Sequence, residues 1–314
     1  MLIATGGFTD ALAAGNSPRF RGFGRVVAAL HLEMQMINRL KSVNKRIWLS
    51  GPYAVWVLGF TVIPLCMIIK AALTGREGGF TFGNIVAIFD PIHLKAMLFS
   101  LEIAAGCTLL CILLSYPLVL AMRQLNMGKK GFMMFVLILP MWMNFILRIL
   151  AWQMILSNNG ILNFLLRSAG LHELSVANTG TAIMIGVVYD YLPYMMLPIF
   201  NAVAEINEDL IEAARDLGAN GFTVFCKVIF PLSIPGLLSG IVMVFVPSMT
   251  SFVISDILGG GKLQLIGNVI EQEFTKSMNQ NLGSGLSVSL MIFVLISMAF
   301  TMKNDREGKR SAIW

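Results

Sequence analysis

Apolar residues along this chain form six long runs, and polar or charged residues are concentrated between them. Each run is about 20 residues or longer, which is the length that an α-helix needs to cross the hydrocarbon core of a bilayer. The pattern therefore predicts membrane-spanning helices joined by short polar loops. The predicted spans are residues 48–73, 97–122, 132–152, 181–204, 234–258 and 284–302.

Composition supports the same fold class. Hydrophobic residues make up 56% of the 314 positions, charged residues make up 13%, and the mean hydropathy is +0.76. Soluble domains have about 45–50% apolar residues, glycine included, and about 25% charged residues. We therefore predict an all-α polytopic membrane protein with six transmembrane helices. The length leaves no room for a large additional soluble domain.

Basic residues are unevenly distributed among the loops, and this distribution predicts the orientation. Cytoplasmic loops of membrane proteins carry an excess of Lys and Arg. Most of the 23 basic residues lie near the two ends, near residue 123 or between the fourth and fifth spans, so both termini are predicted to be cytoplasmic. The expected divisions are a basic N-terminal segment (1–46), a six-helix membrane domain (47–303) with a cytoplasmic coupling loop (205–231), and a C-terminal tail (304–314).

The N-terminal segment does not have the arrangement of a signal peptide, because its charges do not precede a short apolar core and a small-residue cleavage site. Residues 25–40 place apolar side chains at helical spacing, which is consistent with a helix along the inner membrane surface. A partly disordered basic tail fits the composition equally well.

The most polar stretch is EDLIEAARDLGANGFTVFCKVIFP, residues 208–231. Asn207 is a suitable N-cap, and the two acidic residues after it suit the positive end of a helix dipole. Gly218 can adopt the left-handed conformation that ends a helix. A short helix is therefore predicted over residues 208–217. One of its sides would carry Leu210, Ala214 and Leu217, and another would carry the acidic pair Glu212 and Asp216.

EAARDLG and, nine residues later, VIFP resemble the cytoplasmic loop signature of the inner-membrane subunits of binding-protein-dependent ABC importers. Val228 and Phe230 stand where that family usually has Ile and Leu, and both are apolar replacements. The resemblance implies that the short helix docks into a groove of an ATP-hydrolysing partner and transmits its motion. The alternative is an ordinary polar connector. The residues that this resemblance assigns to docking are Glu212, Ala213, Ala214, Asp216, Gly218 and Pro231.

The resemblance extends over about residues 48–302. Within the family, the chain resembles the spermidine/putrescine permease subunits, and the B type more than the C type. Two stretches carry this resemblance: LPMWMNFILRILAWQMILSNNGILNFLL and SDILGGGKLQLIGNVIEQEF. It implies the type I ABC importer permease fold in a bacterial inner membrane. The excess of Lys and Arg is interpreted as a record of topology, so no nucleic-acid partner is expected. The implied partners are a dimer of ATP-binding subunits, a second permease subunit, an extracytoplasmic substrate-binding protein and a polyamine. Whether the substrate is putrescine, spermidine or both stays open.

The sequence carries no motif of an ATP site or of catalysis. GGGKL (259–263) lacks the first glycine of a phosphate-binding loop, and Leu263 follows the lysine in place of Ser or Thr. The three histidines are far apart, and the four cysteines lack metal or redox spacing. We therefore predict a transport subunit that is not itself an enzyme, with no cofactor and no metal site.

Polar residues within predicted spans are costly, so they are candidates for a substrate pathway. A polyamine needs carboxylates for its ammonium groups and aromatic faces for cation–π contacts, and Asp190 among tyrosines supplies both. The alternative is that Arg148 and Asp190 neutralise each other and hold two helices together. Asn144, Arg148 and Trp152 recur at i,i+4 spacing on the third span, and Asp190 and Tyr194 do so on the fourth. Tyr189 stands beside Asp190 and is a candidate as well.

On the fifth predicted span, Pro247 can kink the helix, and a row of polar side chains follows it. Such a face suits a translocation path, whereas tight helix packing through small residues explains the same serines. Asp256 could attract cations at the outer mouth or could simply be solvated. These candidates are Ser248, Ser251, Phe252, Ser255 and Asp256.

Other functions remain as alternatives. An importer of the same class could carry another small solute. An ion-coupled secondary transporter is disfavoured, because the two halves show no clear inverted repeat and few intramembrane carboxylates are available for ion coupling. A purely structural membrane scaffold would leave the signature of the coupling loop unexplained.

Overall fold

The computed structural model describes the backbone of residues 51–75, 78–123 and 127–311, and the predicted N-terminal segment (1–46) lies outside these residues. The chain divides into two units, Met1–Met67 and Ile68–Trp314. In the first unit, residues 51–57 are helical. They continue through the π-helical turn η1 (Leu58–Val62) into α3 (Ile63–Ala72), whose last residues belong to the second unit.

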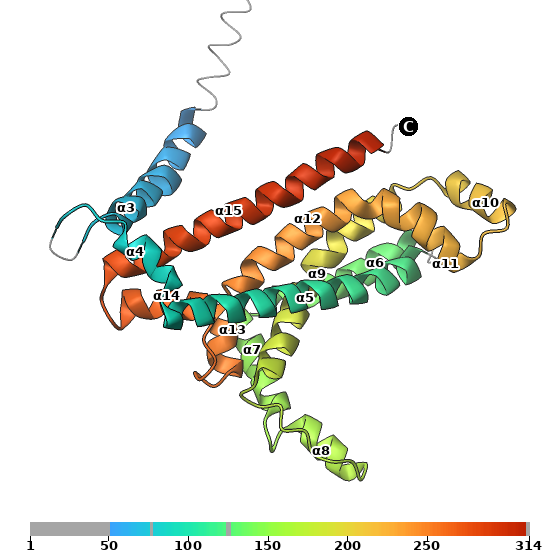
Figure 1. The fold of residues 1–314 in the computed structure, drawn as a ribbon. Coiled ribbons are helices and arrows are strands. Elements are labelled where there is room, and N and C mark those ends of the chain that lie inside the picture. Colours follow the sequence, from blue (N-terminus) through green and yellow to red (C-terminus); the bar gives the residue numbers. More distant parts are fainter. Residues whose placement is uncertain (1–50, 76–77, 124–126, 312–314) are drawn as a thin grey trace, which may run out of the picture. The chain divides into compact units, whose positions relative to one another are not determined.

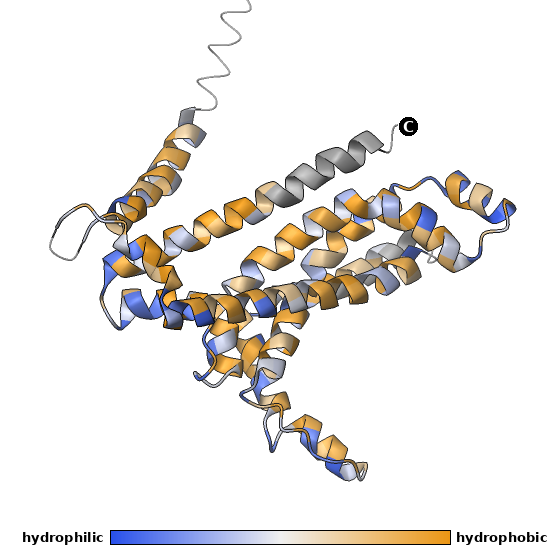
Figure 2. Cartoon of the chain, in the orientation of Figure 1, coloured by the Kyte–Doolittle hydropathy of each residue, from blue (hydrophilic) through white to orange (hydrophobic). Residues whose placement is uncertain are grey.

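Three long helices form the core of the second unit: α5 (Pro91–Arg123), α9 (Gly180–Ala204) and α12 (Phe230–Met249). They lie side by side, and each packs on the other two (Figure 1). Fully buried apolar side chains such as Val187 and Val244 fill the contact. Figure 2 shows hydrophobic residues along most of these helices, as expected for segments that meet lipid as well as each other.

Glycine allows α12 to approach α9 closely. A Cβ atom at Gly236 would collide with the carbonyl oxygen of Pro198 and the side chain of Ala202. Small residues at such contacts permit the tight van der Waals packing that holds helices together in a membrane, where lipid is as apolar as the side chains. Because α9 and α12 flank the coupling loop, this contact fixes the base of that loop.

Shorter elements pack on α15 (Gln280–Ser311). α4 (Gly83–Val86) and the 3₁₀ turn η2 (Ala87–Phe89) lie against it. Ser289 Oγ donates a 2.8 Å hydrogen bond to the Ile85 carbonyl, which links α15 to α4.

The core separates two polar regions (Figure 1). At one end, α13 (Phe252–Leu258) and α14 (Ile266–Thr275) pack on each other. At the opposite end, α10 (Glu208–Asp216) leads through α11 (Gly221–Val224) and the π-helical turn η4 (Phe225–Ile229) into α12. Figure 2 shows hydrophilic residues at both ends.

Six helical segments among the described residues are long and apolar enough to cross a membrane, which confirms the predicted number. The first, second, fourth and sixth agree with the predicted spans except at their ends. The six segments are Gly51–Ala72, Pro91–Arg123, Phe145–Ser168, Gly180–Ala204, Gly221–Met249 and Gln280–Ala299.

The predicted third span, residues 132–152, is wrong as a single helix. Pro140 cannot donate the N–H that would continue a helix, and Asn144 starts a new one by accepting hydrogen bonds from the N–H groups of its first turn. The segment of sufficient length is Phe145–Ser168 instead. The elements in this region are α6 (Met127–Ile138), the 3₁₀ turn η3 (Leu139–Trp142), α7 (Phe145–Leu156) and α8 (Ile161–Ser168).

The predicted fifth span, residues 234–258, is also wrong as a single helix. α12 ends at Met249, and the N–H and hydroxyl of Thr250 both turn back to the Pro247 carbonyl at 3.2 Å. A separate short helix, α13, follows. The segment long enough to cross therefore begins and ends earlier than predicted, at Gly221–Met249.

Gly236→Val should destabilise the protein, because the added methyl groups have no space between α9 and α12. Overpacking a close contact costs about 1–3 kcal/mol. Gly131→Val is the matched control, because no described atom outside the backbone of its own helix lies within 4 Å of a Cβ added there. Heating the detergent-solubilised variants and measuring the soluble, monodisperse fraction should show a lower midpoint for Gly236→Val alone. Equal midpoints would contradict the close contact.

Candidate transport site

A buried ion pair joins α7 to α9 in the interior of the second unit. The guanidinium of Arg148 contacts the carboxylate of Asp190, and 10% and 8% of the two side chains are exposed. Arg148 Nη1 also donates a 2.7 Å hydrogen bond to the Pro140 carbonyl in η3. Arg148 therefore connects α9 with both sides of the break between α6 and α7.

The charges of this pair depend on each other. Removing an ion from water costs several kcal/mol, and the attraction between the partners has to offset that cost. Paired, Arg148 and Asp190 leave the interior neutral. The Nε of Arg148 is buried without a hydrogen-bond partner among the described residues, so the guanidinium keeps one free donor beside the pair.

Aromatic residues adjoin the ion pair in the sequence, and their rings face two different helices. Trp152 of α7 packs edge-on against Tyr189 of α9, with 5.1 Å between the ring centroids. Tyr191 is directed to α12, where its hydroxyl donates a 3.3 Å hydrogen bond to a carbonyl. The ring of Tyr194 lies 6.0 Å from that of Tyr191. The tyrosines around Asp190 thus form two groups, and the one next to α7 includes a tryptophan.

Asn144 does not share a helical face with Arg148 and Trp152, which corrects the sequence prediction. It is the N-cap of α7, and its Oδ1 accepts hydrogen bonds from the N–H groups of Ile146 and Leu147 at 3.0 and 3.2 Å. Its side chain is occupied by the helix start.

The predicted row of Ser248, Ser251, Phe252 and Ser255 does not form one helical face either, because α12 ends before Ser251 and α13 starts at Phe252. The hydroxyls of Ser248 and Ser255 donate to nearby carbonyls at 3.0 and 2.7 Å. Ser251 is buried and lies 3.5 Å from the hydroxyl of a tyrosine of α9. The hydroxyls of Ser248 and Ser255 thus serve a helix end and a local turn, whereas Ser251 contacts α9.

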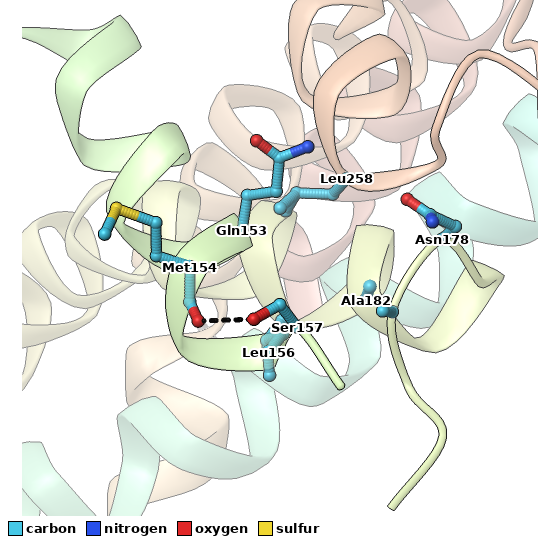
Figure 3. A pocket seen from close by; sticks show the side chains of 8 residues that line it. Gln153, Met154, Leu156, Ser157, Asn178, Ala182 and Leu258 are labelled. Carbon is cyan, nitrogen blue, oxygen red and sulfur yellow. Dashed lines mark hydrogen bonds between the residues drawn. The ribbon is translucent and has the colours of Figure 1, made fainter. Parts of the chain in front are cut away.

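A hollow of about 280 Å³ lies beside α7, α9 and α13 (Figure 3). Gln153 and Asn178 contribute its amide groups, and Ser157 Oγ donates a 3.0 Å hydrogen bond to the Met154 carbonyl within it. The eight described residues that line it carry no charge, so the hollow lacks a carboxylate for an ammonium group. Asp256, the acid predicted at the outer mouth, is exposed on α13 and is not among the described residues that line the hollow.

The coupling loop folds locally as predicted. α10 begins after Asn207, whose Oδ1 accepts a 3.1 Å hydrogen bond from the Asp209 N–H. It is followed by Gly218 at φ +82°, in the left-handed conformation. The N–H groups of Gly218 and the next residue bond back to carbonyls of the last turn at 2.8 and 3.0 Å, which completes the glycine-terminated helix end.

α10 buries one side and exposes the others. Ile211, which the sequence prediction did not single out, is 3% exposed and belongs to the hydrophobic core. Leu217 is 90% exposed and Leu210 is half exposed. Glu212 and Asp216 are exposed as well, so an apolar and an acidic edge are both accessible. Of the other residues that the resemblance assigns to docking, Ala213 and Pro231 are exposed and Ala214 is half-buried.

Two residues of α5 contact this region, and the sequence did not connect them with it. Arg123 forms an ion pair with Glu208 of α10 at 3.2 Å, and the hydroxyl of Tyr116 lies 2.9 Å from that of Ser233 on α12. A basic residue at the end of a predicted helix signals an interaction with a helix terminus. The sequence does not show which terminus folds beside it.

Residues 117–304 match the family described as binding-protein-dependent transport system inner membrane component. The chain belongs to this family. It is therefore a multi-pass permease component of the inner membrane, in agreement with the six apolar helices and with the signature of the coupling loop.

Individual permeases align with most of the chain. The spermidine/putrescine transport system permease protein PotB of Haemophilus influenzae is 34% identical over 249 residues, which cover 77% of this chain and 87% of that protein. PotB of Escherichia coli is 34% identical over 76% of this chain and 89% of its own length. The inner membrane ABC transporter permease protein YdcU of Escherichia coli is 26% identical over 71% of this chain and 75% of its own length.

Solved structures share the fold of this permease. A crystal structure of a bacterial alginate ABC transporter, in complex with an alginate pentasaccharide-bound periplasmic protein, contains a chain that aligns with a TM-score of 0.71 at 16% identity. The alignment covers 84% of this chain and 96% of that one. This likeness confirms the predicted ABC permease fold.

Asp190→Asn should destabilise the permease, because it leaves the charge of Arg148 buried without a counter-charge. Breaking a buried pair in this way costs about 3–5 kcal/mol. The double variant Asp190→Asn/Arg148→Met should recover part of this loss, because it removes both charges, while the Pro140 carbonyl loses its hydrogen bond from Arg148. The amount of each variant in the membrane fraction and its melting midpoint after solubilisation measure the effect.

The matched control is Glu173→Gln, which breaks the exposed ion pair with Arg167 at 3.0 Å. An exposed pair contributes only about 0–1 kcal/mol, so this variant should behave like the parental permease. A double variant at the interior pair that stays as unstable as Asp190→Asn would show that the two buried charges are not coupled.

Proposed function

We propose that this permease forms part of the transmembrane path of an ATP-driven importer of polyamines. The observation that carries the proposal is the 34% identity to PotB permeases over more than three quarters of the chain. The chemistry of the interior supports it. Among the described residues, Asp190 is the one acidic side chain that is buried, and a polyamine is recognised through its ammonium groups.

In the proposed path, a substrate ammonium replaces the Arg148 guanidinium as the counter-ion of Asp190. The carboxylate then stays paired in a surrounding of reduced dielectric, and the released Arg148 guanidinium keeps its hydrogen bond to the Pro140 carbonyl. Trp152 follows Arg148 by one turn on α7, Tyr189 directly precedes Asp190 on α9, and the two rings are in contact. Their aromatic faces suit cation–π contact with the ammonium group and packing of the methylene chain. Without substrate, Arg148 occupies Asp190 and excludes other cations from it.

In the proposed assembly, a dimer of ATP-binding subunits hydrolyses ATP, and α10 of this chain docks on one of them. A second permease subunit completes the path, and an extracytoplasmic binding protein delivers the substrate. The exposure of Leu210 and Leu217 on a polar segment outside the spans supports docking, because exposed apolar side chains there suit an interface with another protein. In this assembly the coupling loop and both termini are cytoplasmic.

Asp190→Asn/Arg148→Met should assemble but should not import polyamines, because the interior is neutral and the carboxylate for the ammonium group is gone. A charged hydrogen bond contributes about 1.5–3 kcal/mol, which corresponds to a loss of roughly tenfold or more. Uptake of radiolabelled spermidine and of putrescine should be measured in proteoliposomes that hold the whole importer.

Basal ATP hydrolysis and the yield of assembled complex serve as controls and should stay near parental values. Parental uptake in the double variant would contradict a substrate role for Asp190, and the ion pair would then be a structural junction alone.

Gly218→Val should reduce uptake, because a β-branched residue is strained at a φ of +82° by about 1–2 kcal/mol. Gly221→Val is the matched control: it lies in the same loop, its Cβ would also meet open space, and its φ is not positive. Uptake should fall in Gly218→Val and stay near parental in Gly221→Val, while the binding protein keeps its affinity for ligand. Equal uptake in the two variants would contradict a coupling role for this helix end.

A further inference from the structure

Arg123, the last residue of α5, contacts three acceptor groups around the start of the coupling loop. Its Nη1 donates to the Val203 carbonyl at 3.4 Å, and its Nη2 donates to the Ile206 carbonyl at 3.2 Å. Nη2 also lies 3.2 Å from Oε1 of Glu208. These acceptors stand before, within and after the short connection between α9 and α10. One side chain thereby holds the angle at which α10 leaves α9.

These contacts set the direction of α10 relative to α9 and add little to the free energy of unfolding. Glu208 is 65% exposed, so water screens its attraction to Arg123 and the ion pair contributes little. The two carbonyls lie at and just beyond the end of α9, where a helix presents partly negative oxygens that lack an intrahelical partner. A planar guanidinium can hold several such acceptors in one geometry, whereas an ammonium acts as a point charge.

The other end of the coupling loop rests on the same helix. Tyr116 lies two turns before Arg123 on α5, so both side chains point to one side. Its hydroxyl contacts Ser233 of α12, and its ring packs against Phe225 of η4 and Phe230 of α12, with 5.4 and 5.6 Å between centroids. α5 therefore contacts the coupling loop both where the chain enters it and where the chain leaves it.

The opposite end of α5 holds the polar region around α14. The N–H of Ile266, the first residue of α14, donates a 2.7 Å hydrogen bond to Oγ of Ser100, which is fully buried. Ser100 and Arg123 are separated by roughly 35 Å along the helix axis. The helix stays continuous through Pro117 between them. One element thus reaches from the coupling loop to α14.

We propose that Arg123 is the positioning residue through which α10 and α5 move together, so that a displacement of α10 by an ATP-binding subunit reaches α14. This inference rests on the proposed function, because it takes α10 as the docking helix. Arg123 holds the entry of the loop, Tyr116 supports its exit, and α5 carries the displacement to Ser100 and Ile266.

The test follows a reporter thiol in α14 while ATP-binding subunits act on α10. The full complex, with Gln272→Cys as the reporter, is reconstituted in proteoliposomes, and the alkylation rate of the reporter is measured with and without ATP and vanadate. Arg123→Gln removes the three contacts, and Arg123→Lys keeps the charge without the planar fork. Arg167→Gln breaks an exposed ion pair elsewhere and is the control. The native thiols to be replaced are Cys66, Cys107, Cys111 and Cys226.

In the parental complex and in the control, ATP and vanadate should change the alkylation rate about fivefold or more. Both Arg123 variants should lose most of this change while they bind the ATP-binding subunits as the parental chain does. A purely structural role would lower the yield of complex and leave the response intact in the complexes that form.

Three outcomes overturn the inference: a parental response in either Arg123 variant, no response in the parental complex, or loss of the ATP-binding subunits from the Arg123 variants. Failure of the proposed function gives different results. In one case the parental chain binds no ATP-binding subunit, so α10 is no docking helix and the inference about Arg123 falls with it. In the other case the complex assembles but imports no polyamine. The reporter needs no substrate, so it decides on Arg123 in the latter case as well.

Discussion

Backbone hydrogen bonding inside lipid is the constraint on which the rest of this structure depends. No water is available there to pair a free N–H or C=O group, so a spanning segment has to be helical and every break has to be satisfied by the protein. This chain breaks twice within its predicted spans, and polar side chains meet the backbone at both breaks. Asn144 caps α7, Arg148 donates to Pro140, Tyr191 donates to Pro247, and Asn268 donates to Phe252.

Most polar residues that a sequence suggests for a substrate path are therefore committed to the fold. Asp190 differs from them, because among the described contacts its carboxylate meets Arg148 and no backbone group. Asp190 can therefore exchange its partner without leaving a backbone N–H or C=O group unpaired in the lipid interior. Among the candidates for the proposed path, Asp190 is therefore the one whose change of partner would cost the helices least.

The sequence predictions were accurate where neighbours in the chain decide the structure, and less accurate where distant segments interact. The coupling helix was predicted nearly to the residue, because its N-cap at Asn207 and its glycine end at Gly218 are decided by neighbours in the chain. The third and fifth spans were misplaced, because the segments on both sides of each break are apolar and hydropathy does not register Pro140 or Pro247 as an end. The contacts of Arg123 were missed, because its acceptors lie some 80 residues away in the chain. The pairing of Arg148 with Asp190 stayed one of two alternatives for the same reason.

The shared fold does not decide the charge of the substrate. A structure with a TM-score of 0.68 to this chain belongs to a transporter described as importing the acidic polysaccharide alginate. The fold alone therefore does not set the sign of the substrate's charge, and the proposed preference for cations depends on individual side chains. The ion pair of Arg148 and Asp190 is neutral in sum, but its members are not equivalent. When a cation takes Asp190, Arg148 keeps its bond to the Pro140 carbonyl. When an anion takes Arg148, Asp190 is left without a described partner. In the proposed path, the second contact of Arg148 would therefore make exchange with a cation less costly than exchange with an anion.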